Sequence, residues 1–198
     1  MAWTAENRTT ANIKTSDAPL LTEPMKQYLR EKYLPRYPIK RAVLLPALHM
    51  VQHAYNYIPM QALQELAEVL ELSPSEALDT ATFYEEYYLK PKGKYLLQVC
   101  RSLPCEICRS GEITDHLKAK LNLDVGETTP DGRYTLVELE CLGACGEAPV
   151  MLVNEQLLPN LTPEKLDEIL ASLPEHPGDY RDPSVQWEEE HAPGAAGH

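Results

Sequence analysis

The chain has 198 residues, 43% of them hydrophobic, so it can form one hydrophobic core or two small ones. Its formal net charge of −12 argues against nucleic acid and anionic membrane surfaces as partners, because like charges repel. The longest nearly apolar run, AVLLPAL at 42–48, is far shorter than the ~20 residues that span a bilayer, and residues 1–14 resemble neither an export signal nor a transit peptide. We therefore expect a cytoplasmic protein, without membrane insertion, whose partner is another protein with a basic face.

Residues 1–20 are polar without an apolar period, which predicts a flexible arm. Residues 21–90 are predicted to form a helical bundle, with helices that begin after Thr22, near Pro46, after Pro59 and after Ser73. The positions expected to face its core are Met25, Tyr28, Leu29, Tyr33, Val43, Leu44, Ala47, Leu48, Val51, Ala54, Leu63, Leu66, Ala67 and Leu70. The aromatic residues that follow, Phe83, Tyr84, Tyr87 and Tyr88, are interpreted as packing residues between domains.

Residues 91–173 change to the period of strands. KYLLQVC at 94–100 and YTLVELEC at 134–141 each lead into a cysteine, and the segments on either side of Asn154 and Glu155 are predicted to form a hairpin. Helices are predicted over 104–121, with Ile107, Ile113, Leu117 and Leu121 inward, and over 162–170. Residues 174–198 are rich in proline and acid, which predicts an unstructured tail. The expected fold class is α+β, a bundle followed by a sheet domain.

Five cysteines lie in two clusters, CRSLPCEIC at 100–108 and CLGACGEAP at 141–149. A [2Fe–2S] cluster takes two thiolates on each tetrahedral iron, so two loops that each supply a close pair suit it. Cys100 with Cys105 forms one such pair and Cys141 with Cys145 the other, and Cys108 is left over. Because both pairs follow strands, we expect the two loops at one edge of the sheet. Small residues in the second loop should let backbone N–H groups approach the sulfurs.

Four motifs in order, ATFYEEYYLKPKGKY, QVCRSLPC, GETTPDGRYTL and ECLGACGEAPVM, resemble the [2Fe–2S] subunit (24 kDa subunit) of respiratory NADH:quinone oxidoreductase, complex I. The resemblance covers residues 22–173 and implies a helical bundle followed by a thioredoxin-like ferredoxin domain. It implies that Cys100, Cys105, Cys141 and Cys145 bind one [2Fe–2S] cluster. Cys108 and the tail depart from the family's usual pattern.

The resemblance also implies a role in electron transfer. The chain would exchange electrons with the flavin of a partner subunit that binds FMN and NADH, in a complex peripheral to the inner membrane. No glycine motif for a nucleotide is found in the sequence, so the chain alone should not oxidise NADH. Related alternatives are the equivalent subunit of a soluble NAD-dependent hydrogenase or formate dehydrogenase, and a free-standing thioredoxin-like ferredoxin.

Three other interpretations of the cysteines stay open on the sequence. A plant-type ferredoxin would use Cys100, Cys105 and Cys108, although that fold needs strands upstream rather than helices. The CEIC motif could be a dithiol active site at the start of a helix, which would leave three cysteines without a role. Four of the thiolates could hold a structural zinc, although their spacings are looser than those of a zinc knuckle.

Overall fold

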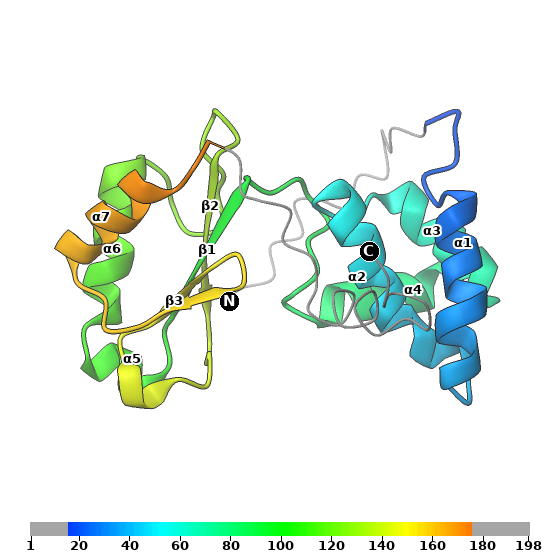
Figure 1. The fold of residues 1–198 in the computed structure, drawn as a ribbon, viewed down its shortest axis with the longest axis horizontal. Helices are drawn as coiled ribbons and strands as arrows, with labels where there is room; N and C mark the ends of the chain where they lie inside the picture. Colours follow the sequence, from blue (N-terminus) through cyan, green and yellow to red (C-terminus); the bar gives the residue numbers. More distant parts are fainter. Residues whose placement is uncertain (1–15, 176–198) are drawn as a thin grey trace, which may run out of the picture. The chain divides into compact units, whose positions relative to one another are not determined.

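The computed structural model describes residues 16–175, so residues 1–15 of the predicted arm and 176–198 of the predicted tail lie outside the described part. The chain divides into two compact units, one that ends at Lys92 and one that begins at Gly93. Helices form the first unit, and a mixed sheet with helices forms the second (Figure 1). The predicted α+β class is therefore confirmed.

The first helix, α1 (Glu23–Tyr28), begins at the predicted cap. The Thr22 hydroxyl accepts a hydrogen bond from the Met25 N–H at 3.4 Å, which satisfies one of the free donors at the helix start. The chain continues through a π-helical turn (Leu29–Tyr33) and a 3₁₀ turn (Leu34–Arg36). The predicted first helix is thus present, but its last turns are not regular α-helix.

The rest of the bundle consists of a 3₁₀ turn, η4 (Lys40–Val43), and three helices, α2 (Leu44–Tyr55), α3 (Met60–Leu70) and α4 (Pro74–Phe83). At the start of α4 a complete capping box is present. The Ser73 hydroxyl accepts from the Glu76 N–H at 3.3 Å, and the Glu76 carboxylate accepts from the Ser73 N–H at 3.0 Å. Two donors that would be free at the helix start are therefore bonded, as the sequence predicts.

Most of the predicted core positions of the bundle are buried. Those buried are Leu29, Val43, Leu44, Ala47, Leu48, Val51, Leu63, Leu66, Ala67 and Leu70. The prediction is wrong for Ala54, which is exposed in the last turn of α2. Of the aromatic residues expected to pack between domains, Phe83 and Tyr84 are exposed at the end of α4, whereas Tyr87 is buried in the bundle, and the packing between domains stays a prediction. The exposed aromatic pair therefore has no role in the core of the bundle.

Residues 16–21 are attached to α3 rather than free. The N–H groups of Leu20 and Leu21 donate to the Glu65 carboxylate at 3.2 and 2.6 Å, and the Ser16 N–H donates to the Gln61 side chain at 2.6 Å. Leu21 is fully buried in the core of the bundle. The end of the predicted arm is thus part of the folded unit, held by polar side chains that an apolar pattern does not reveal.

The second unit contains a sheet of four strands, β1 (Tyr95–Cys100), β2 (Tyr134–Leu139), β3 (Met151–Val153) and β4 (Gln156–Leu158), in the order β2-β1-β3-β4. β1 and β2 are parallel, while β3 is antiparallel to β1 and to β4. The helices α6 (Ser110–Leu121) and α7 (Pro163–Ser172) cover one face (Figure 1). The predicted hairpin is present, and its turn includes Asn154 in the left-handed region.

The single helix predicted over 104–121 is two helices, α5 (Leu103–Ile107) and α6. Arg109 separates them with a φ of 68°, a left-handed conformation that no α-helix can contain. As a result α5 does not share the inward face of α6. Ile113 and Leu117 are buried as predicted, but Ile107 is 74% exposed, so its predicted inward position is wrong.

Within residues 16–175, no helix has the length and apolar character needed to cross a membrane.

Gly93 lies close to the backbone of Tyr134, the first residue of β2, and its substitution tests this close approach. Its N–H donates to the Thr135 hydroxyl at 2.6 Å, and a Cβ placed there would lie 2.7 Å from the Tyr134 carbonyl carbon. Because backbone cannot yield as a flexible side chain does, Gly93→Ala should lower the free energy of unfolding of this unit by about 1–3 kcal/mol. Urea denaturation followed by circular dichroism would measure it.

Gly111→Ala is the matched control, because the added methyl group would meet only the Glu106 carboxylate, at 3.5 Å. Alanine is also the better helix former, so this change should be neutral or stabilising by up to about 1 kcal/mol. Equal effects of the two substitutions would contradict the close approach at Gly93.

Candidate metal centre

The parallel pairing of β1 with β2 brings the two cysteine loops together. Cys100, the last residue of β1, is in register with Leu139, the last residue of β2, and Cys141 follows two residues later. The first loop leads directly into α5, which contains Cys105. In the second loop a 3₁₀ turn begins at Cys145. The prediction that both loops lie at one edge of the sheet is therefore confirmed.

The four thiols lie in two different environments. Cys100 and Cys105 are 2% and 1% exposed and pack against Val150, whereas Cys141 and Cys145 are exposed. Leu142, Ala144 and Ala148 complete the small apolar cluster around the buried pair. The first pair is thus shielded from water by the sheet and α5, and the second lies at the surface.

The pKa values of two thiols show that members of the two pairs are neighbours. The pKa of Cys105 is raised to about 11, mainly by burial and with smaller contributions from the nearby thiols of Cys100 and Cys145, against a backbone hydrogen bond with Val150 that lowers it. Partial desolvation of its sulfur also raises the pKa of Cys145, although the residue as a whole is exposed, with further contributions from Cys141 and Cys100. Each of these two thiols is therefore within interaction range of a thiol in the other loop.

Backbone groups of the second loop contact the sulfurs, as its small residues predict. Gly143 has a φ of 75°, which favours glycine, and its N–H donates to the Cys141 sulfur at 3.4 Å. The Cys100 thiol lies 3.7 Å from the Glu140 carbonyl oxygen, which belongs to the start of the same loop. An N–H donor stabilises negative charge on sulfur, so this bond would offset part of the charge of a sulfur that ligates a metal.

A charged pair joins the two loops, and the sequence pattern does not predict it. Arg101 follows Cys100, Glu140 precedes Cys141, and the Arg101 Nε donates to the Glu140 carboxylate at 3.0 Å. The Arg101 N–H also donates to the Leu139 carbonyl at 2.8 Å, which extends the ladder of the two strands by one bond. The only signal in the sequence is that opposite charges stand next to the first cysteine of each pair.

Cys108, the cysteine that the sequence leaves over, lies at the C-terminal cap of α5 and is exposed. Its N–H donates to the Pro104 carbonyl at 3.1 Å, so its backbone completes the short helix. Cys105, in the same helix, is buried against Cys100 and Val150. Within the CEIC motif, Cys105 therefore faces the loop that carries Cys141 and Cys145, whereas Cys108 faces solvent.

The donor set fits a two-iron cluster. In residues 16–175, no three His, Cys, Asp or Glu side chains converge on one position for a single ion. A [2Fe–2S] cluster does not need such convergence, because each of its two irons takes only two protein thiolates. Two separate pairs of soft thiolate donors on adjacent loops meet that requirement. Cys100, Cys105, Cys141 and Cys145 would hold the cluster.

Iron–sulfur proteins hold their clusters by cysteine thiolates, and two adjacent loops with paired thiols place the chain in this class of protein. The family model for thioredoxin-like [2Fe-2S] ferredoxins matches residues 30–174. The chain belongs to this family. The predicted resemblance and the predicted [2Fe–2S] cofactor are therefore confirmed, whereas the assignment of the four ligands stays a prediction.

Several curated relatives, all named as subunits of NADH-quinone oxidoreductase, are similar over most of their length. One from Rhizobium meliloti is 39% identical over 138 residues, which cover 70% of this chain and 82% of the relative. NADH-quinone oxidoreductase subunit 2 of Thermus thermophilus is 36% identical over 151 residues, 75% of this chain and 83% of the relative.

Among solved structures, the chain is similar to an NAD⁺-reducing [NiFe]-hydrogenase in the air-oxidized state. The sequence identity is 25% and the TM-score 0.58, and the match covers 74% of this chain. This chain spans 28% of the length of that hydrogenase chain. The similarity therefore concerns one part of a larger protein.

The ligand assignment predicts different results for the five cysteines. Serine in place of Cys100, Cys105, Cys141 or Cys145 should each weaken or abolish cluster binding, because an alkoxide is a harder and poorer ligand for iron than a thiolate. Iron and acid-labile sulfide per chain, measured after anaerobic purification, should fall from two of each in the unchanged protein. Cys108→Ala should leave both values unchanged. Loss of iron in Cys108→Ala with retention in Cys141→Ser would contradict the assignment.

The Gly143 N–H predicts an effect on reduction potential. In Gly143→Ala the side chain strains a left-handed backbone, so the N–H should move from the Cys141 sulfur. Reduction adds negative charge, which this donor stabilises, so the potential should fall. The potential would be measured by EPR-monitored redox titration. Gly126→Ala is the matched control, because Gly126 has a φ of 90° and is not in the cysteine loops. A fall of equal size in the control would contradict the role of the donor.

Proposed function

We propose that this chain is the [2Fe–2S] electron-transfer subunit of an NADH:quinone oxidoreductase and exchanges electrons with the flavin of an NADH-oxidising partner subunit. The observation that carries the proposal is the pairing of cysteines on two adjacent loops in a member of the thioredoxin-like ferredoxin family. The relatives in Rhizobium meliloti and Thermus thermophilus bear the name of subunits of this oxidoreductase, and the chain covers more than four-fifths of each.

The residues of the chain hold and insulate the cofactor. When bound, the cluster accepts and releases one electron at a time. Cys100 and Cys105 would bind it from the buried side, where the sheet and α5 exclude water. Cys141 and Cys145 would bind it from the exposed side, and the Gly143 N–H would offset part of the negative charge on sulfur.

The chain needs a flavoprotein partner for the chemistry of NADH. Hydride transfer delivers two electrons at once, so a carrier such as flavin must accept the pair before single electrons can leave. The sequence contains neither common glycine motif for a nucleotide. The carrier of the hydride electrons is therefore assigned to the partner subunit, and this chain acts as part of a multi-subunit enzyme.

A second candidate is the equivalent subunit of a soluble NAD-dependent hydrogenase. The observation that favours it is the similarity to the NAD⁺-reducing [NiFe]-hydrogenase at a TM-score of 0.58. The two candidates share the site and differ in the rest of the complex. Identification of the subunits that co-purify with this chain would separate them, since a nickel–iron subunit belongs only to the hydrogenase.

The proposal predicts a reaction that depends on the partner. Isolated and with its cluster assembled, this chain should show no change in visible absorption or EPR spectrum on addition of NADH. With the flavoprotein encoded beside it, the chain should form a stable complex. NADH should then reduce the flavin, and the EPR signal of a reduced [2Fe–2S] cluster should appear as far as its potential allows.

The two parts of this experiment test different statements. Prompt NADH oxidation by the isolated, flavin-free chain would contradict the assignment of NADH oxidation to the partner subunit. Failure to bind the co-encoded flavoprotein would instead favour a free-standing ferredoxin.

A further inference from the structure

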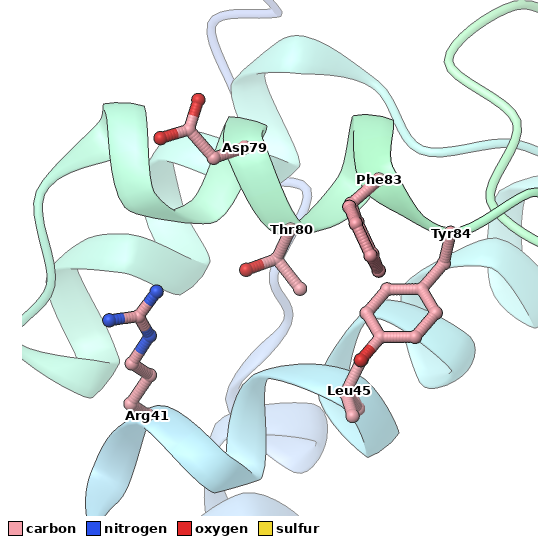
Figure 2. A pocket seen from close by; sticks show the side chains of 6 residues that line it. All are labelled: Arg41, Leu45, Asp79, Thr80, Phe83 and Tyr84. Carbon is pink, nitrogen blue, oxygen red and sulfur yellow. The ribbon is translucent and has the colours of Figure 1, made fainter.

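The helical bundle contains an open groove with a volume of about 350 Å³ between α4 and the start of α2. It is lined by Arg41, Leu45, Asp79, Thr80, Phe83 and Tyr84. Figure 2 shows the two aromatic rings and Leu45 at one end, Arg41 at the other, and Thr80 between them. The groove thus combines an apolar end with a cationic end, and none of its residues belongs to the candidate metal centre.

Two exposed aromatic side chains of the bundle, Phe83 and Tyr84, line this groove. In the described part of the first unit, the exposed large hydrophobic residues are Tyr37, Ile39, Phe83 and Tyr84. Phe83 is 78% exposed and meets Tyr84 edge-on, with ring centroids 5.1 Å apart. Ile39 is 61% exposed and lies two residues before Arg41. Exposed apolar residues gathered in one place indicate a protein interaction site, because their burial there would be favourable.

The segment that leads into the groove is basic, although the whole chain is acidic. Residues 30–41 contain five basic residues and one acidic residue in a protein of net charge −12. The basic residues are Arg30, Lys32, Arg36, Lys40 and Arg41, and all five are exposed. Lys40 already pairs with Glu71 at 2.5 Å, and the positive charge that the segment retains beyond this pair would attract a negatively charged segment of a partner.

The charges within the groove leave the Arg41 guanidinium accessible to such a segment. Arg41 lies 3.8 Å from Glu76 with 60% of its side chain exposed, and an exposed pair at this distance is weak. The Glu76 carboxylate bonds mainly to Ser73 in the capping box, which is the main cause of its lowered pKa. Asp79 also lines the groove, but its carboxylate points away from Arg41 (Figure 2).

We propose that this groove, together with the basic segment 30–41, is a docking site for an acidic segment of the flavoprotein partner that inserts an aromatic or aliphatic side chain between Phe83 and Leu45. The inference rests on the proposed function for the identity of the partner. The apolar side chain would cover Phe83 and Tyr84, and a neighbouring carboxylate would bind Arg41. A second copy of this chain is a poorer occupant, because its matching surface would be equally basic.

The test measures the dissociation constant between the full-length, cluster-bearing chain and the purified flavin- and NADH-binding subunit at low and high salt. Phe83→Ser should weaken binding about 10- to 100-fold at both, since a buried aromatic anchor carries much of an interface's energy. Arg41→Glu should weaken binding about 10-fold at low salt and less at high salt, where screening reduces the repulsion.

The controls are Lys118→Glu, the same charge change on α6, and Val125→Ser, which removes another exposed apolar side chain. Both should bind within about twofold of the unchanged chain.

The possible outcomes separate this inference from the proposed function. No complex between the unchanged chain and the flavoprotein would overturn the proposed function and with it the docking site. A normal complex in which Phe83→Ser and Arg41→Glu also bind within twofold would overturn the docking site alone. An effect of Phe83→Ser that is present in the full-length chain and absent after deletion of residues 176–198 would assign the groove to the chain's own tail. A dimer of the unchanged chain that Phe83→Ser dissociates would assign it to a second copy. Either result would overturn the proposal.

Discussion

The candidate metal centre depends on the parallel pairing of β1 and β2. Residues 100 and 141 are far apart in the sequence, and the hydrogen bonds of this pair place the loops that follow the two strands next to each other. The Arg101–Glu140 contact and the bond from the Arg101 N–H to Leu139 continue the association beyond the strands. A shift of register by one residue would turn Cys100 to the opposite face of the sheet and separate the pairs.

The pairing also gives the site two unequal sides. β1, α5 and Val150 enclose one pair of thiols in an apolar setting, while a loop of small residues presents the other pair to solvent. A redox centre needs shielding from water to define its environment and access to a partner to exchange electrons. Here the two requirements are met by different loops. The helical unit contributes a separate surface, with its own charge and its own apolar groove.

The sequence predicts most elements of the fold because their local signals are strong. Thr22, Ser73 and Thr162 each accept a backbone hydrogen bond at a helix start, as their positions indicate. The break between α5 and α6 was not predictable, since an arginine in the left-handed region has no characteristic signal. The sequence does predict that the two cysteine loops lie side by side, because each loop follows a strand. It does not predict the contact between Arg101 and Glu140, because a period of apolar residues carries no information on which charges meet across loops.

The central strand also determines how stiff the two sides of the site are. All six residues of β1 are buried, and the strand is paired along both of its edges. Backbone amides in such a strand exchange with solvent only when the whole unit opens, whereas an exposed surface loop opens locally at little cost. Cys100 is thus attached to the most rigid part of the unit, and Cys141 and Cys145 to a more compliant part. We therefore expect the exposed loop to take up the small displacements that accompany a change of charge, while the buried thiols keep their positions.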